Sequence, residues 1–195
     1  MKTLKNLLFV VIGFFAISSL SSCGYNTMVQ LDENVKAKWG QVENAYQRRA
    51  DLIPNLVNTV KGAANFEQQT LTQVVEARAK ATSVNVDADN LTPENIAQFQ
   101  QAQGALSQSL GRLLATVEAY PDIKSNQNFL QLQAQLEGTE NRISVERRAF
   151  IEATQAYNSE IRQFPNNLMA GMFGFKPKGT FTAEAGADQA PEVEF

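Results

Sequence analysis

The sequence contains no histidine among its 195 residues and a single cysteine, Cys23. The absence of histidine excludes the common zinc sites, the Ser-His-Asp triad and the Cys-His pair, because each of these needs an imidazole. One cysteine excludes an internal disulfide. The chain also lacks the GxGxxG, GxxxxGK[ST] and GxSxG motifs of nucleotide-binding proteins and serine hydrolases. These absences predict a protein without catalytic residues, a metal or a cofactor.

Positive charge is not in excess, since 17 lysine and arginine residues face 20 aspartate and glutamate residues. A nucleic-acid-binding protein needs a basic face to contact phosphates, so nucleic acid is not an expected partner. Glycine and proline are sparse through the middle of the chain, whereas alanine, asparagine and glutamine are abundant. This composition is typical of long helices, and the length predicts one domain.

The N-terminus carries the features of a secretion signal. Lys2 and Lys5 precede the apolar run LLFVVIGFFAI at residues 7–17. This run is shorter than the about 20 residues that a transmembrane helix needs. Small residues follow, and Leu20-Ser21-Ser22-Cys23 resembles the bacterial lipobox. The resemblance implies cleavage before Cys23 and attachment of lipid to its thiol.

We therefore predict a lipoprotein signal peptide at residues 1–22 and a lipidated tether at residues 23–27. Bacterial lipoproteins carry a diacylglycerol and usually a third, amide-linked chain such as palmitate, and two or more chains hold a protein firmly in a bilayer. The expected location is the extracytoplasmic side of a cell-envelope membrane, with the lipid bilayer as a partner. Two alternatives remain, an uncleaved N-terminal anchor and an ordinary signal peptide in which the cysteine is incidental.

After the tether, apolar residues recur at intervals of three and four, as on one face of a helix. The inward positions of the four segments are Met28, Leu31, Val35, Trp39, Val42, Tyr46, Arg49, Ile53, Leu56 and Val60; Leu71, Val74, Val75 and Arg78; Ile96, Phe99, Gln103, Leu106, Leu110, Leu113 and Val117; and Phe129, Leu132, Leu136, Glu140, Ile143, Arg147, Phe150, Thr154, Tyr157, Ile161 and Phe164. Short connections favour antiparallel neighbours. We therefore predict an all-α fold, an antiparallel four-helix up-and-down bundle of long helices at residues 28–164, with a single extended coiled coil as the alternative.

Prolines, a glycine and a capping residue mark the ends of these helices. Pro54 lies inside the first helix and predicts a kink or a local break, because proline has no N–H to donate. Gly62 predicts the end of that helix. Thr92 and Pro93 predict the start of the third helix, as cap and first residue. Pro165 predicts the end of the fourth.

The chain after the predicted bundle divides into two parts. Residues 165–178 form an apolar extension punctuated by glycine, which could pack on the bundle, touch the membrane surface or bind a partner. Packing on the bundle is the default expectation. Residues 179–195 are acidic and rich in small residues, which predicts a disordered tail.

Three charged residues, Arg49, Glu140 and Arg147, lie in the apolar stripes. If Arg49 faces Glu140 across the antiparallel first and fourth helices, the apolar ends of both helices also match, and Arg147 comes near Glu43. We therefore predict a structural polar core of these four residues that sets the register of the helices. A ligand-binding or catalytic site is the alternative. Neighbouring arginines disfavour it, because they lower the pKa of a carboxyl and weaken it as a general acid or base.

Longer motifs resemble those of the LemA family. The resemblance is carried by RRADLIPNLVNTVKG at 48–62, VVEARAKA at 74–81, LEGTENRISVERRAF at 136–150 and AYNSEIRQFPNNLMAGMFGFKPK at 156–178. It implies an antiparallel four-helix bundle attached to a membrane at its N-terminus, through a transmembrane helix in many members and through lipid here. It implies no enzymatic activity. The residues that match the family pattern include Arg49, Asp51, Pro54, Glu140, Asn141 and Arg142.

Together, the predicted anchor and the predicted helical body suggest a membrane-anchored, non-enzymatic interaction or scaffold module. The expected protein partner is a membrane or envelope protein that the sequence does not identify. The alternative function is a small-ligand binder or an enzyme that uses the polar core around Glu140.

Overall fold

The computed structural model describes residues 2–62 and 66–182, and it describes side chains from residue 24 onward. These residues contain helices and no strand, so the predicted all-α class is confirmed. The helices are α1 (Lys2–Lys61), α2 (Gln68–Ser83), α3 (Pro93–Val117), α4 (Pro121–Lys124), α5 (Gln127–Glu160) and α6 (Asn166–Phe173). The helices α1, α2, α3 and α5 correspond to the four predicted segments, whereas the short helices α4 and α6 are additions to that prediction.

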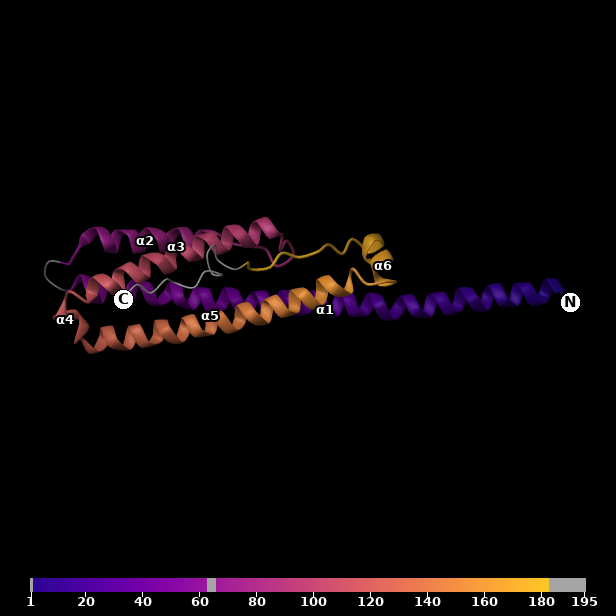
Figure 1. Ribbon diagram of the computed structural model, residues 1–195, viewed down its shortest axis with the longest axis horizontal. Coiled ribbons are helices and arrows are strands. Elements are labelled where there is room, and N and C mark those ends of the chain that lie inside the picture. The colour runs from indigo at the N-terminus through magenta and orange to yellow at the C-terminus, as the bar shows by residue number, and fades with distance from the viewer. Residues whose placement is uncertain (1, 63–65, 183–195) are drawn as a thin grey trace, which may run out of the picture.

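The long helices pack into an elongated body (Figure 1). Helix α5 packs along α1, α3 packs along α2, and α2 packs on α1. The ring contact of Trp39 with Phe150 and the ion pair of Arg49 with Glu140 place α1 and α5 in opposite directions. Helix α1 continues past the other helices towards the N-terminus (Figure 1).

The N-terminal part of α1 is continuous with the part that packs in the body. Residues 23–27, which were predicted as a tether, are part of helix α1. The side chain of Cys23 lies outside the described residues, as does residue 1. Among the residues with described side chains, no helix is long and apolar enough to cross a membrane.

The end of α1 and the start of α3 follow the sequence prediction. Helix α1 ends at Lys61, next to Gly62. Pro93 is the first residue of α3, and the side-chain oxygen of Thr92 accepts a hydrogen bond from the backbone N–H of Asn95 at 3.2 Å. The capping residue thus satisfies one of the N–H groups that the first turn leaves without a helical partner.

Helix α5 ends earlier than predicted. Its last residue is Glu160, and a turn at residues 161–165 leads into α6. The residue before a proline disfavours helical backbone, and the turn before Pro165 satisfies this restriction. Phe164, which was predicted to face the core, is consequently 81% exposed. The predicted burial of Val75 is also wrong, because its neighbour Val74 occupies the inward position on α2.

Helix α1 continues through Pro54, so the local break, one of the two predicted alternatives, is absent, and a contact with α2 satisfies the carbonyl that the proline leaves free. Proline cannot donate to the carbonyl of the residue four positions earlier, which is Ala50. The guanidinium of Arg78 donates its Nε–H to this carbonyl at 2.7 Å. A side chain from α2 therefore supplies the hydrogen bond that Pro54 removes, and it joins α2 to α1 at this point.

We expect Arg78→Met to lower the free energy of unfolding by about 1–3 kcal/mol, because the carbonyl of Ala50 loses its donor. In a Pro54→Ala background the loss should be smaller by about 1 kcal/mol, since residue 54 then donates to Ala50 within the helix. Urea unfolding of the four chains of this cycle measures the coupling. Arg112→Met on the exposed face of α3 is the matched control. An equal loss from Arg78→Met in both backgrounds would contradict the explanation.

The buried side chains form two apolar clusters that follow one another along α1. The first cluster includes Trp39, Phe99, Phe150 and Tyr157, and the second includes Ile53, Leu106, Leu113 and Leu136. Trp39 and Tyr46 are buried in the first cluster, as the stripe predicts. The two clusters are separated by a polar layer that is described below.

The chain after α6 returns along the body, and we call residues 175–182 the C-terminal strap (Figure 1). The hydroxyl of Tyr157 donates to the carbonyl of Lys176 at 3.1 Å. The side chain of Asn158 donates to the carbonyl of Lys178 at 2.8 Å and accepts from its N–H at 2.9 Å. Main-chain groups of the strap thus form hydrogen bonds with side chains of α5. The default expectation that the extension packs on the body holds for this part.

The strap continues beyond the predicted start of the disordered tail at residue 179. The N–H of Gly179 donates to the carbonyl of Leu91 at 2.8 Å. Phe181 is buried, and its ring packs against Trp39 and Phe150 with centroids 6.1 and 5.6 Å away. The prediction of disorder is therefore wrong for residues 179–182, because one aromatic side chain fills a site in the core. Residues 183–195 lie outside the described residues.

Candidate functional site

Arg49 lies at the centre of the polar layer between the two apolar clusters. Its side chain is 1% exposed. One terminal nitrogen, Nη1, donates to Glu140 Oε1 at 2.8 Å and to Ser107 Oγ at 2.7 Å. The other, Nη2, donates to the side-chain and main-chain oxygens of Gln103 at 2.7 and 3.2 Å. A single guanidinium on α1 thus binds α3 and α5.

Gln103 extends this layer to α2, the one long helix that Arg49 does not contact through these bonds. Its oxygen accepts from Arg49, while its nitrogen donates to the carbonyl of Ala81 near the end of α2 at 3.2 Å. The sequence stripe placed Gln103 at an inward position without giving it a role. Ser107, one turn later on α3, is not in the stripe. Arg49 and its partners therefore connect all four long helices at one level of the body.

The two ends of the Arg49–Glu140 ion pair differ in exposure. The side chain of Glu140 is 47% exposed, so the carboxylate is not buried as its place in the stripe predicted. Thr139 occupies the inward position on this turn of α5. The ring of Tyr46 lies 5.0 Å from the guanidinium carbon of Arg49. Burial, above all, raises the pKa of the Tyr46 hydroxyl.

The structure brings Arg49 and Glu140 together and leaves Arg147 and Glu43 outside this ion pair. The guanidinium carbon of Arg147 lies 4.5 Å from the centroid of the Phe181 ring, so this arginine covers the strap. Glu43 is half-buried on α1, and desolvation by burial raises the pKa of its carboxyl. Salt bridges among the described residues do not include either side chain, so the polar core is smaller than the predicted network of four.

A second charged cluster joins α1 to the strap. Lys36 pairs with Asp89 at 2.7 Å, Glu33 at 3.0 Å and Asp32 at 3.1 Å. Lys178 of the strap also binds Asp32, at 3.0 Å. These hydrogen bonds raise the pKa of Lys36 above its ordinary value, and the hydrogen bond with Asp89 contributes most to the shift. The sequence analysis did not identify this cluster, because its members come from three separate segments.

The guanidinium of Arg49 is held by the protein and is not itself a reacting group. Both terminal nitrogens of Arg49 are bound by the protein's own oxygens, and its Nε–H is buried without a partner among the described residues. A guanidinium donates hydrogen bonds but does not lose a proton at physiological pH, so it cannot act as a general acid. No group of three His, Cys, Asp or Glu residues in the described part of the chain could hold a metal ion.

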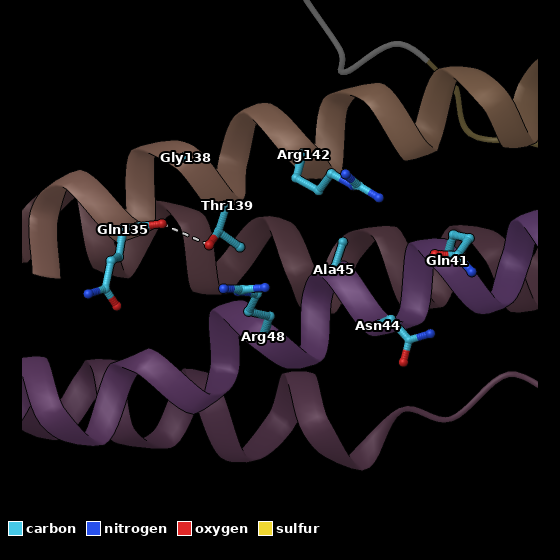
Figure 2. Close-up of a pocket in the computed structure, with 8 residues that line it drawn as sticks. All are labelled: Gln41, Asn44, Ala45, Arg48, Gln135, Gly138, Thr139 and Arg142. Atoms are coloured by element: carbon cyan, nitrogen blue, oxygen red, sulfur yellow. Dashed lines mark hydrogen bonds between the residues drawn. The ribbon is translucent and has the colours of Figure 1, made fainter.

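A polar groove lies beside this layer, on the surface between α1 and α5 (Figure 2). It has a volume of about 570 Å³ and is lined by Gln41, Asn44, Ala45, Arg48, Gln135, Gly138, Thr139 and Arg142. Arg48 and Arg142 approach it from opposite helices (Figure 2). The small residues Ala45 and Gly138 leave the space, and the two arginines make an anion the ligand class that would suit it. Arg142 also pairs with Glu146 at 2.6 Å.

Comparisons of the sequence with known proteins find one family and several relatives. A model of the LemA family matches residues 38–195. "Magnetosome protein MamQ 2" of Paramagnetospirillum magneticum is 29% identical over 185 residues, which cover 84% of this chain and 66% of that protein. "Magnetosome protein MamQ" of Magnetospirillum gryphiswaldense is 28% identical over 171 residues, which cover 78% of this chain and 62% of that protein.

A further relative is "Protein LemA" of Metamycoplasma hominis, which is 25% identical over 146 residues that cover 74% of this chain and 63% of that protein. The chain thus matches two thirds or less of the length of each of these relatives. The family model, in contrast, covers most of the chain, including Arg49, Pro54 and Glu140. On this match the chain belongs to the LemA family.

Proposed function

We propose that this protein is a membrane-anchored, non-enzymatic scaffold, in which α1, α2, α3 and α5 form the antiparallel up-and-down bundle of the LemA type. The main support is the Arg49 layer, because its terminal donors are bound by Glu140, Ser107 and Gln103. A polar core in which both terminal nitrogens of the arginine are bound by neighbouring helices acts on register and stability, as a structural role requires. The same layer gives a bundle a rigid surface on which a membrane or envelope protein can dock.

The proposed anchor is lipid on Cys23 at the cell-envelope membrane. Leu20-Ser21-Ser22-Cys23 supplies the sequence of a lipobox, and the apolar run at residues 7–17 precedes it. Cys23 is followed directly by residues of α1 that pack in the body, so the lipid would hold the bundle close to the bilayer. Attachment by two or more acyl chains is stable.

Metabolic labelling with palmitate tests the anchor. We expect the wild-type chain to incorporate the label and to sediment with membranes. We expect Cys23→Ser to incorporate no label. Where its mass shows that the signal peptide has been removed, Cys23→Ser should also leave the membrane fraction. Ser22→Ala keeps the thiol and a small neighbour, so it is the matched control. Equal labelling of Cys23→Ser and the wild type would contradict lipidation at this residue.

In-cell crosslinking followed by detergent extraction tests the scaffold. The wild type, Cys23→Ser and a chain truncated after Phe164 are compared. We expect one membrane or envelope protein to be recovered with the wild type and lost from at least one variant. Recovery of no specific protein with any of the three chains would contradict the scaffold function.

The groove between α1 and α5 supports a second candidate, the binding of a small anion. It is lined by Gly138 and Thr139, which precede Glu140 in the sequence, and it lies on the surface rather than in the core. Calorimetric titration with inorganic phosphate and with glutamate tests this candidate. We expect any binding to be lost in Arg48→Ala/Arg142→Ala and retained in Arg148→Ala, and no heat with either anion would contradict it.

A further inference from the structure

Helix α6 has apolar side chains on both of its faces. Ala170 is buried and Met169 packs against the first core cluster, so the inner face is covered. Leu168, Met172 and Phe173 are exposed, and the exposed fraction of Met172 is 78%. A helix that is apolar all round normally has both faces covered. We call these three exposed side chains the outer face of α6.

The outer face lies beside the part of α1 that follows the proposed lipidation site. A Cβ atom added to Gly24 would overlap the side-chain amide of Asn166, the first residue of α6. The rings of Tyr25 and Phe173 pack edge to face, with centroids 4.9 Å apart. Helix α6 is therefore packed against the residues that come directly after Cys23, at the end of the body from which α1 projects (Figure 1).

The direction of α1 argues for a lipid surface rather than another occupant. The apolar run at residues 7–17 lies on the same helix, and its near end is about 10 Å beyond Gly24 at 1.5 Å per residue. Either lipid on Cys23 or an uncleaved N-terminal helix would bring this end of the body to the bilayer. The outer face of α6 would then meet the membrane without any rearrangement of the helices.

The side chains around α6 also suit a membrane interface. Tyr25 and Phe164 are exposed, and aromatic side chains are enriched at the level of the headgroups. Arg162 and Lys176 are exposed cations on either side of α6 in the sequence. Cations next to an apolar surface attract anionic lipids, so charge and apolar area act in the same direction.

We propose that the outer face of α6 inserts into the surface of the bilayer to which the chain is anchored. This inference rests on the membrane anchoring proposed above and adds a second attachment point to it. One attachment at Cys23 leaves the body free to swing about the anchor. A second attachment at α6 holds the body in one orientation and presents the same helices to a docking protein.

The test uses the full lipidated chain in vesicles of phosphatidylethanolamine and phosphatidylglycerol. Met172→Cys introduces a thiol that is labelled with a nitrobenzoxadiazole fluorophore, while Cys23 is blocked by lipid. Leu130→Cys, at the start of α5 and another exposed hydrophobic position, is the matched control. We expect the label at 172 to show blue-shifted emission, protection from iodide, and several-fold stronger quenching by spin-labelled lipid than the label at 130.

Equal access of iodide to both labels would overturn the insertion of α6. The proposed anchoring would still stand in that case, provided that the wild-type chain stays with the vesicles and takes up no fluorophore. Protection of position 172 without quenching by lipid would also overturn it, because a protein surface would then cover α6. A wild-type chain that takes up the fluorophore at Cys23 and leaves the vesicles would contradict the anchoring itself and this inference with it.

Discussion

Arg49→Ala is expected to lower the free energy of unfolding by about 3–5 kcal/mol, because it removes the central donor of a buried polar layer. The variant leaves the buried side chain of Gln103 without its charged partner between two apolar clusters, and the exposed Ser107 loses the same donor. It also leaves a space in the core that the neighbouring side chains fill only in part. Urea unfolding monitored by circular dichroism measures the loss.

The partners of Arg49 should contribute unequally to this loss. Glu140→Gln is expected to cost less than Arg49→Ala, because the side chain of Glu140 is 47% exposed and its pairing is screened by water. Gln103→Leu is expected to cost more than Glu140→Gln, since it removes the buried oxygen nearest to Nη2 and also the donor to Ala81. This order distinguishes a buried layer from a surface ion pair, in which both partners would matter equally.

Arg48→Ala is the control for Arg49→Ala, since Arg48 is the adjacent arginine and its side chain is exposed. We expect its effect to stay within about 0.5 kcal/mol. If Arg49→Ala were no more destabilising than Arg48→Ala, the layer would not hold the four helices together. The structural support for the scaffold proposal would then be lost.

The register of α1 and α5 could be predicted from the sequence because both helices carry a continuous apolar stripe. Aligning the two stripes in opposite directions leaves Arg49 opposite Glu140, where the structure places them. The stripe could not give the exposure of Glu140, because an interval of three or four does not say whether a position lies at the centre or at the edge of a face. Thr139 takes the central position instead.

Features that depend on several segments at once were beyond the sequence. Helix α1 is continuous through Pro54, and Arg78, on another helix, donates to the carbonyl of Ala50 that the proline leaves free. No local rule about proline contains this contact. The family motifs include both Pro54 and Arg78, yet nothing in the motifs says that the two residues act on one carbonyl. The order of residues 179–182 likewise depends on a core site that other helices form.

Phe181→Ala is expected to undock the strap and to lower the free energy of unfolding by about 3 kcal/mol. Phe181 is buried against Trp39 and Phe150, and Arg147 lies over its ring. Removing the ring leaves a cavity beside Trp39, which is the only tryptophan of the chain. Its emission should therefore shift to longer wavelength and become accessible to acrylamide, and this fluorescence reports on the strap site directly.

A second variant separates docking of the strap from the size of the Phe181 side chain. A Cβ atom at Gly179 would lie 2.6 Å from the Cα atom of Pro93, which is backbone that cannot move aside. Gly179→Ala should consequently displace the strap and change the fluorescence of Trp39 in the same direction, although it leaves Phe181 intact. Phe164→Ala, which removes an exposed ring, should change neither the emission wavelength of Trp39 nor its accessibility to acrylamide. If Gly179→Ala left the emission of Trp39 unchanged while Phe181→Ala shifted it, the strap would not dock as a unit, and Phe181 would act on the core alone.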